Sequence, residues 1–276
     1  MKVRKKTIIK KVGITGAAGT IGEILTQSLS DDYDLTLFYN HTEVKNNKIK
    51  KFKVNLIDAE EIRGKFEGLD TVIHLAGDRK SHSPWESILN KNIIATYNVF
   101  EEAQRAGVAK VIFASTNMVQ HGQSMLGEPN PSASYDVRRL ESMKLAPFFV
   151  RHKGYIRLSD PPAPNSYYAV SKLFGENLCW YYSRVYNIQV VALRIGSIGK
   201  NDDPSSVKGT MIEDYVRAMY LSKRDCVEAF KKALEVEIDY LVAYVISDND
   251  RRFFDMKESM EKLGTNPKDN SEDYYK

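Results

Sequence analysis

Cysteine is scarce in this chain of 276 residues: only Cys179 and Cys226 are present, far apart in segments with helical patterns. There is no C-x-x-C pair and no other spacing typical of a disulfide framework or a bound metal. We therefore expect neither a disulfide nor a metal site. Cysteine use of this kind fits a protein of the reducing cytosol.

Long hydrophobic runs are also missing. The apolar stretches are far shorter than the ~20 residues that a membrane-spanning helix needs, and the N-terminus lacks the apolar segment of a signal peptide. Hydrophobic residues nevertheless make up 42% of the chain, which is ample for the core of one domain, or of one domain and a lobe. We expect a soluble, cytoplasmic protein with no membrane partner.

Neither sign of charge dominates, because the net charge is only +4. Basic residues gather in residues 2–11 and again in residues 45–53. Such runs can bind nucleic acid, but no motif of interleaved aromatic and basic residues accompanies them. A solvated tail and a solvated loop explain these runs better, so we expect no nucleic-acid partner.

A glycine-rich turn is the strongest local feature of the sequence. Residues 12–22, VGITGAAGTIG, follow the apolar pair Ile8-Ile9 and precede a helical pattern of apolar residues. This order predicts a strand, a tight turn and a helix whose N-terminus can hold a pyrophosphate. Gly16 and Gly19 would let the backbone approach the phosphates, and Gly22 would let the helix pack closely on the strand.

An acidic residue is missing where dinucleotide-binding proteins often carry one. The second predicted strand, residues 35–39, ends in Tyr39-Asn40-His41, whereas an Asp or Glu about 20 residues past the glycines would bind the ribose 2′-hydroxyl. An acid there would repel a 2′-phosphate, and its absence removes that barrier. His41, Lys45 and Lys48 could even attract one. We expect NAD or NADP as the cofactor, with NADP at least as plausible as NAD.

Further strands alternate with helices along the chain. Apolar runs predict strands at 52–58, 71–77, 111–114, 190–195 and 241–246, with helical patterns at 88–107, 165–186, 222–234 and 253–263. This rhythm is typical of a Rossmann-type α/β fold with a doubly wound parallel sheet. His74 lies inside a predicted buried strand and is better interpreted as a packed residue than as a catalyst.

Residues 118–165 are less regular and contain several prolines. A loop this long in a compact domain is often functional, and a simple surface excursion is the alternative. We interpret residues 1–276 as a single unit with a nucleotide-binding core at about 7–195. The substrate-binding parts are expected at about 118–165 and in a small C-terminal lobe, residues 196–276.

Tyr168 and Lys172 stand four residues apart in the helix predicted from residue 165, so they share one helical face. A cationic lysine beside a phenol favours the phenolate and would lower the pKa of Tyr168 from about 10. A hydroxyl from Ser115 or Thr116, at the end of a predicted strand, could hydrogen-bond a substrate oxygen. Tyr-x-x-x-Lys is common by chance, but its place after a glycine-rich turn in an α/β chain makes proton chemistry the better interpretation.

Together these motifs resemble the extended short-chain dehydrogenases/reductases of the NAD-dependent epimerase/dehydratase superfamily. The glycine-rich turn and the Tyr-x-x-x-Lys segment carry this resemblance. Other stretches resemble uronate dehydrogenases and, still more, the short-chain-type glucose-6-phosphate dehydrogenases of archaea. These stretches are 74–78 with 84–85, 113–117, 193–197, 221–226 and 247–250. The similarity spans nearly the whole chain.

The resemblance implies an enzyme that oxidises a sugar (an aldose, a sugar phosphate or a uronate) at C1 to the lactone, with hydride transfer to the nicotinamide of NAD(P). Tyr168 would act as the general base. Lys172 would hold the cofactor ribose and tune Tyr168. Thr116 or, less favoured, Ser115 would orient the sugar hydroxyl, because either residue supplies a hydroxyl group.

The resemblance also implies which residues line the two binding sites. The residues that would contact substrate are Asp78, Asn117 and Ser197. Those that would contact the cofactor lie in the glycine-rich turn, at strand ends and around the catalytic pair. They are Gly16, Ala18, Gly19, Thr20, Ile21, Tyr39, Asn40, Asn55, Leu56, Leu75, Ala76, Gly77, Asn92, Ala114, Tyr168, Lys172 and Ile195.

Several positions depart from the pattern of the family. Tyr39 replaces an acid, which puts a preference for NAD in doubt, and Met118 replaces a histidine that contacts substrate. The arginine that holds the carboxylate in uronate dehydrogenases has no counterpart at Tyr215, although Arg217 is close, so a neutral or phosphorylated sugar is favoured over a uronate. The basic residues of the long loop, better explained as facing solvent than as ligands of an anion, are Arg151, His152, Lys153 and Arg157.

Two other functions stay open from the sequence. A sugar-nucleotide epimerase or dehydratase that keeps NAD bound would share the same core. A non-catalytic nucleotide-binding regulator is the third possibility, against which the intact catalytic pair argues. In the family, helices equivalent to residues 88–107 and 167–186 often pack in dimers. The second carries Leu173, Leu178 and Trp180 around much of its surface, so we expect a homodimer.

Overall fold

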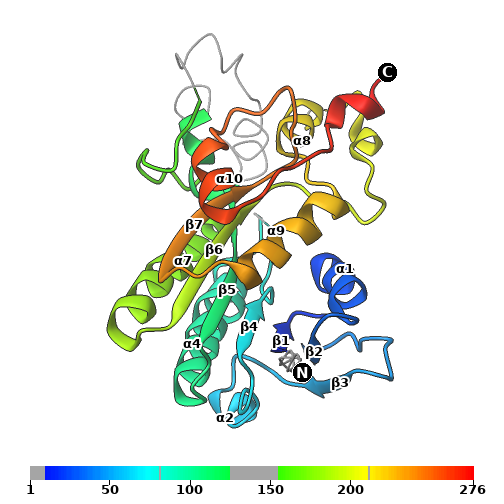
Figure 1. The fold of residues 1–276 in the computed structure, drawn as a ribbon. Helices are drawn as coiled ribbons and strands as arrows, with labels where there is room; N and C mark the ends of the chain where they lie inside the picture. The colour runs from blue at the N-terminus through cyan, green and yellow to red at the C-terminus, as the bar shows by residue number, and fades with distance from the viewer. Residues whose placement is uncertain (1–9, 81, 125–154, 211) are drawn as a thin grey trace, which may run out of the picture.

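A single parallel sheet forms the centre of the computed structural model, which describes residues 10–80, 82–124, 155–210 and 212–276 (Figure 1). Its seven strands lie in the order β3-β2-β1-β4-β5-β6-β7, and every neighbouring pair is parallel. The strands are β1 (Lys11–Thr15), β2 (Asp34–Tyr39), β3 (Lys50–Lys53), β4 (Thr71–His74), β5 (Lys110–Thr116), β6 (Gln189–Ile195) and β7 (Tyr240–Val245). The predicted Rossmann-type α/β class is confirmed.

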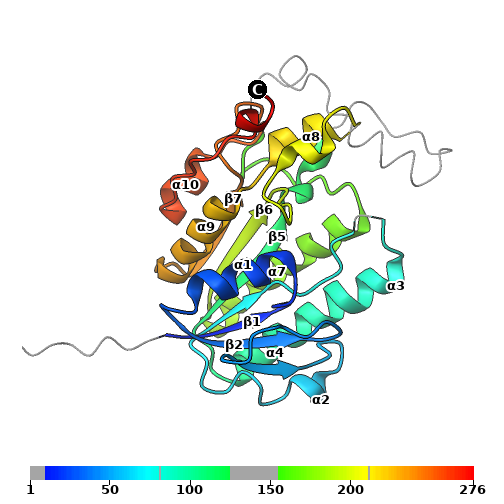
Figure 2. The same ribbon diagram turned by 90° about the vertical axis from the view of Figure 1, so that its right-hand side faces the viewer.

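Helices cover both faces of the sheet, as a doubly wound fold requires. On one face, α1 (Thr20–Leu29) lies against α9 (Lys223–Glu235). On the other face, α4 (Ala95–Arg105) lies against α7 (Tyr167–Tyr186), and the short α2 (Ala59–Ile62) packs on α4. The two faces are separate in Figure 2, where α1 and α9 lie on one side of the strands and α4 lies on the other.

Each central strand contributes side chains to both faces. In β5, Ile112 and Ala114 belong to the apolar cluster under α1 and α9, while Val111 and Phe113 belong to the cluster under α4 and α7. The strand is buried along its whole length. Burial on both faces explains why the strands read as continuous apolar runs in the sequence rather than as alternating patterns.

The C-terminal part of the chain adds a smaller cluster above the sheet. It contains α8 (Glu213–Met219) and α10 (Lys257–Leu263), and its core includes Met219, Tyr244 and Phe254. Phe254 pairs with Ile156 in an isolated parallel bridge. That bridge joins the residues just before Arg157 to the C-terminal part of the chain.

Several predicted boundaries are wrong. The stretch 52–58, expected as the third strand and its exit, contains only the end of β3, which begins at Lys50 and ends at Lys53. Residues 54–58 form the exit, and Asp58 accepts a hydrogen bond from the Glu60 backbone N–H at the start of α2. The last helix begins at Lys257 rather than at Phe253, whose side chain is buried with Phe254 in the lobe. The predicted helix 88–107 consists of α3 (Trp85–Ile88), a π-helical segment (Leu89–Ile94) and α4.

No helix within the described ranges is long and apolar enough to cross a membrane. Nor do three or more His, Cys, Asp or Glu side chains gather there in a way that could hold a metal ion. Both cysteines are buried and free.

Candidate functional site

The glycine-rich turn joins β1 to α1 at the centre of the sheet, where the strand order changes direction. Gly16 has a φ angle of +70°, and a Cβ atom built on it would lie 2.7 Å from the backbone N of Ala76, beyond the end of β4. A Cβ atom on Gly22 would lie 2.6 Å from the Ala17 carbonyl oxygen. The turn therefore needs glycine at both positions, as the sequence predicted.

Helix α1 begins directly after this turn, at Thr20, with Gly19 at its N-cap. The Gly19 N–H donates to the Gly16 carbonyl at 2.9 Å, and the Glu23 N–H donates back to the Gly19 carbonyl. The backbone N–H groups of the first helical turn have no acceptor within the helix, and the helix dipole adds partial positive charge there. This arrangement fits the pyrophosphate of a dinucleotide.

The ends of β2 and β3 lie next to the turn. The Asn40 side chain donates to Asn55 Oδ1 at 3.4 Å, and the Asn98 side chain donates to the carbonyls of Leu56 and Ile57. Tyr39 ends β2 and packs partly buried against the core. The predicted cofactor residues of these two strands are thus adjacent.

Tyr168 and Lys172, the candidate catalytic pair, lie near the start of α7. Ser166 caps this helix by accepting a hydrogen bond from the Ala169 N–H. Lys172 is buried, and its Nζ lies 5.9 Å from the ring centre of Tyr168 and 4.9 Å from that of Phe113 on β5. The helix and the strand together therefore fix the relative position of the phenol and the ammonium group.

Burial controls the protonation of both groups. It raises the pKa of Tyr168 to about 12, and a hydrogen bond with Thr116 together with the positive charge of Arg79 acts in the opposite direction. Burial also lowers the pKa of Lys172 to about 8. The predicted lowering of the Tyr168 pKa by Lys172 is wrong for this structure, because burial of the phenol outweighs the charges near it.

Asn92 connects the end of β4 to the catalytic helix. Its Oδ1 accepts from the Asp78 N–H at 2.6 Å, and its Nδ2 donates to the Asp78 carbonyl and to Ser171 Oγ, both at 3.0 Å. A Cβ atom on Gly77 would lie 3.1 Å from Asn92 Oδ1 and 3.6 Å from Lys172 Nζ. The predicted residues Gly77, Asn92 and Lys172 are therefore neighbours in space.

The two candidate hydroxyls at the end of β5 point to different partners. Thr116 acts to lower the pKa of Tyr168, and its Oγ1 accepts from the Met118 N–H at 3.3 Å, whereas Ser115 Oγ donates to the buried carboxylate of Glu176 at 2.6 Å. Ala114 and Ile195, the predicted cofactor contacts of this region, are core residues, and Ile195 lies opposite Thr116 in the sheet register. The Ser115 hydroxyl is thus bonded to a side chain of α7.

Ser115 belongs to a buried network that the sequence analysis missed. Arg194 Nε and Nη2 donate to the two oxygens of Glu176 at 2.8 and 2.7 Å, and Arg194 Nη1 donates to Gln120. The Tyr244 hydroxyl also donates to Gln120. A signal was present in the sequence, since Glu176 follows Lys172 by one helical turn and Arg194 is a charge inside an apolar strand.

The three predicted substrate residues lie around the same edge of the sheet. The Asp78 carboxylate accepts hydrogen bonds from Ser83 and Ser87. Asn117 is buried, and its amide contacts the sulfur of Met219. Ser197 follows β6, and its backbone forms an isolated bridge with Tyr220. Asn117 and Ser197 thus contact the C-terminal lobe, whereas the contacts of Asp78 are within the loop after β4, with α3 and with Asn92.

The basic residues considered for anion binding have other partners or lie elsewhere. Arg217 forms ion pairs with Glu213 and Glu272. Arg157 is exposed, with its Nε 4.0 Å from Asp255. Residues 151–153 lie outside the described residues.

His74 is a packed residue, as predicted. Its two ring nitrogens contact the hydroxyls of Thr15 and Thr96 at 2.7 and 3.1 Å, and burial lowers its pKa to about 3.

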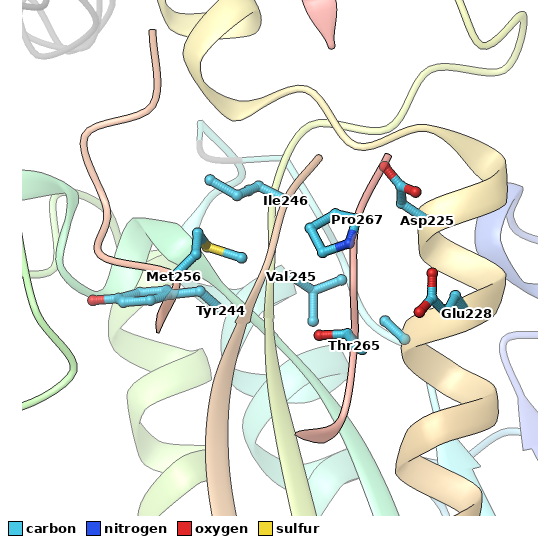
Figure 3. A pocket seen from close by; sticks show the side chains of 9 residues that line it. Asp225, Glu228, Tyr244, Val245, Ile246, Met256, Thr265 and Pro267 are labelled. Carbon is cyan, nitrogen blue, oxygen red and sulfur yellow. The ribbon is translucent and has the colours of Figure 1, made fainter. Parts of the chain in front are cut away.

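The stretch 221–226 has a structural role in this fold. Asp225, at the start of α9, accepts hydrogen bonds from Ser247 Oγ at 2.6 Å and from the backbone N–H groups of Lys268 and Asp269. Figure 3 shows Asp225 facing Pro267 of the C-terminal segment across a small cavity. The cavity measures about 10 Å³, which is space for about one water molecule. This stretch therefore anchors the C-terminal segment to α9.

A larger cavity, of about 520 Å³, lies at the opposite edge of the sheet. It is lined by residues at the strand starts, among them Lys10 and Lys110. Lys110 is buried, and its Nζ donates to carbonyls at the end of α9, including Ala233 and Val236. These contacts are what a cation at a helix C-terminus makes. This cavity lies at the N-terminal ends of the strands, whereas Tyr168 and Lys172 lie near their C-terminal ends.

Comparison with known proteins agrees with this geometry. The chain is 34% identical over 268 residues to an L-arabinose 1-dehydrogenase (NAD(P)(+)) of Haloferax volcanii, covering 95% of this chain and 97% of the relative. It is 32% identical over 272 residues to an NAD-dependent glucose-6-phosphate dehydrogenase of the same organism, covering 95% and 94%. The solved glucuronic acid dehydrogenase of Chromohalobacter salexigens superposes with a TM-score of 0.76 at 26% identity, covering 97% and 88%.

A family model described as NAD dependent epimerase/dehydratase matches residues 12–241, which include the glycine-rich turn, Tyr168, Lys172 and the whole of strands β2 to β6. Members of this family use NAD(P), and the relatives named above are sugar dehydrogenases. The protein is therefore an enzyme of the NAD-dependent epimerase/dehydratase family.

Proposed function

We propose that this enzyme oxidises a sugar at C1 to the lactone and transfers the C1 hydride to NAD(P). The observation that carries the proposal is the meeting of Tyr168, Thr116 and Lys172 at the same sheet edge as the glycine-rich turn. Similarity over nearly the full length to two sugar dehydrogenases supports it.

Each catalytic side chain has one role in the proposed step. Tyr168 removes the proton of the C1 hydroxyl, and the Thr116 hydroxyl holds the same oxygen in line. Lys172 holds the cofactor ribose. The bound nicotinamide supplies the hydride acceptor. The sugar thus loses one proton to Tyr168 and one hydride to the cofactor, and the C1 carbonyl of the lactone forms.

The choice of cofactor depends on the end of β2. Tyr39 stands where an acid would bind the 2′-hydroxyl, and the exposed side chains of His41, Lys45 and Lys48 lie in the following loop. This loop offers positive charge and no acid at position 39, so NADP is at least as good a candidate as NAD.

A panel of sugars tests the proposal directly. NAD+ and NADP+ would each be offered with glucose, glucose 6-phosphate, galactose, arabinose, glucuronate and galacturonate, and the absorbance of reduced nicotinamide would be followed. A rise with one sugar identifies the substrate and the cofactor together. A flat panel from protein that still binds the cofactor contradicts the dehydrogenase and directs attention to nucleotide sugars and an epimerase or dehydratase.

We also propose that the enzyme is a homodimer. The outer face of α7 exposes an aromatic surface, Trp180, Tyr181, Val185 and Tyr186, whose side chains are 41–55% exposed. Tyr97 on the neighbouring α4 is 47% exposed. A contiguous apolar surface of this kind marks an interaction site more often than a free surface. Sedimentation at micromolar protein should give the mass of two chains, and a monomer mass would refute the dimer.

The Ser115 hydroxyl is assigned a positioning role in this proposal. Asp78, Asn117 and Ser197 border the substrate, and the substrate-binding parts are residues 118–165 and 196–276. Residues 7–195 hold the dinucleotide.

A further inference from the structure

The loop that follows β4 presents a cation at the edge of the site. The backbone on both sides of Arg79 is fixed, because the Asp78 N–H donates to Asn92 Oδ1 at 2.6 Å and the Lys80 N–H donates to Asp78 Oδ1 at 3.1 Å. Asn92 is in turn bonded to Ser171 on the catalytic helix. Arg79 is thus placed by the same contacts that place the catalytic pair.

The carboxylate next to Arg79 is already occupied. Ser83 Oγ and Ser87 Oγ donate to Asp78 Oδ2 at 2.7 and 2.6 Å. Burial raises the pKa of Asp78, but the hydrogen bonds from Ser87 and Ser83 outweigh it and leave the pKa below its ordinary value. Asp78 therefore stays ionised and shapes the loop, with both oxygens engaged inside it.

The guanidinium of Arg79 differs from the other arginines considered above. Its side chain is exposed, and no carboxylate of the described ranges lies within 4.0 Å of it. Arg79 directly follows Asp78, which is bonded through Asn92 to Ser171, and Ser171 Oγ donates to the Tyr168 carbonyl at 2.7 Å. This path places Arg79 on the side of the loop that faces the start of α7, and its positive charge acts to lower the pKa of Tyr168. Arg79 is exposed to solvent and has no carboxylate partner among these residues. Its guanidinium group is therefore able to bind an anionic group of a ligand.

We propose that Arg79 determines substrate specificity by binding an anionic group of the sugar, a phosphate or a carboxylate, while the C1 hydroxyl lies against Tyr168. The proposal rests on the dehydrogenase function proposed above and specifies its substrate class. A guanidinium group binds a phosphate or a carboxylate with two parallel hydrogen bonds. The two anions are therefore distinguished by comparing a sugar phosphate with a uronate as substrates.

The test compares Arg79→Gln and Arg79→Lys with the unmodified enzyme on glucose, glucose 6-phosphate and glucuronate. The measured quantity is the ratio of kcat/KM for an anionic sugar to kcat/KM for the neutral sugar. This ratio cancels any effect of Arg79 on the ionisation of Tyr168, because that effect is common to all three sugars. Arg184→Gln is the matched control, since Arg184 is exposed near the far end of α7.

We expect Arg79→Gln to lower the ratio by about 10- to 100-fold, the usual range for a lost hydrogen bond to a charged group, mainly through KM. Arg79→Lys should restore part of the loss, because it keeps the charge and loses the paired geometry. A loss confined to glucose 6-phosphate identifies phosphate as the anion, and a loss confined to glucuronate identifies carboxylate. An unchanged ratio overturns the role of Arg79 and leaves the dehydrogenase standing.

A second readout covers the case in which no sugar is oxidised. Calorimetric titration with glucose 6-phosphate, with glucuronate and with inorganic phosphate measures anion binding without turnover. Weaker binding by Arg79→Gln than by Arg184→Gln then supports the anion site although the dehydrogenase proposal has failed. Equal binding by the two variants overturns the anion site as well.

Discussion

Replacing Arg194 by methionine should destabilise the fold severely. The side chains of Arg194 and Glu176 are only 6% and 5% exposed. Three guanidinium nitrogens are engaged, two on Glu176 and one on Gln120. Methionine fills much of the space but leaves the Glu176 carboxylate buried without its counter-ion. Breaking such a pair from one side costs about 3–5 kcal/mol, which is a large share of the total stability of a domain.

Urea unfolding followed by circular dichroism measures this cost as a change in the free energy of unfolding. Arg63→Met is the matched control, because Arg63 and Glu60 form an exposed ion pair on the surface, and such pairs contribute little to stability. The double variant Arg194→Met with Glu176→Leu removes both charges, so it should lose clearly less than the sum of the two single changes. If Arg194→Met unfolds at the same urea concentration as Arg63→Met, the network does not carry the stability assigned to it.

Three further changes test the site. Tyr168→Phe should lower kcat by about 100- to 10,000-fold, the contribution of a positioned general base, while cofactor affinity measured by fluorescence titration stays the same; retained turnover would exclude Tyr168 as the base. Lys172→Met should raise the free energy of unfolding near pH 7 by up to about 3 kcal/mol, because burial lowers the folded pKa of Lys172 to about 8 from 10.5. For the same reason the free energy of unfolding of the unmodified protein should rise with pH between about 8 and 10.5, because Lys172 is protonated in the unfolded chain and neutral in the folded one there. If this free energy does not change with pH, and Lys172→Met has the same pH dependence, then Lys172 is not buried as a charged group. Gly16→Ala should cost about 1–3 kcal/mol in urea unfolding and abolish cofactor binding, because its Cβ atom would lie 2.7 Å from the Ala76 backbone N at a φ of +70°; unchanged binding would remove the turn from the cofactor site.

The sequence predicted the sheet well because its strands carry their own signal. Strands buried on both faces must be apolar throughout, and the segments at β4, β5 and β6 show this directly. The edge strand β3 carries three lysines in four residues, so its start has no apolar signal in the sequence. Phe253 and Phe254 precede α10 and are apolar, but they pack in the lobe and do not belong to the helix.

The site was predicted where one residue type at one spacing defines the chemistry, as in Tyr168 and Lys172. It was not predicted where the function of a residue depends on contacts distant in the chain. Ser115 and Thr116 are adjacent and chemically alike, and only the position of Glu176, 61 residues away from Ser115 in sequence, distinguishes them. Arg79 gave no signal because its closeness to Tyr168 depends on Asn92, which holds the loop.

The π-helical segment Leu89–Ile94 has a consequence for how this chain tolerates changes in length. A π turn contains one residue more than the α turn around it, and Asn92 lies within the segment. Deleting one residue there would restore a regular α-helix, and α3 and α4 would keep their relative rotation because the π turn is what absorbs the extra residue. The change would fall on the residues of the segment itself. Asn92 would then be displaced from its contacts with Asp78 and Ser171. The extra residue of the π turn thus directs one side chain, and an alignment that closes a gap at this point would discard that information.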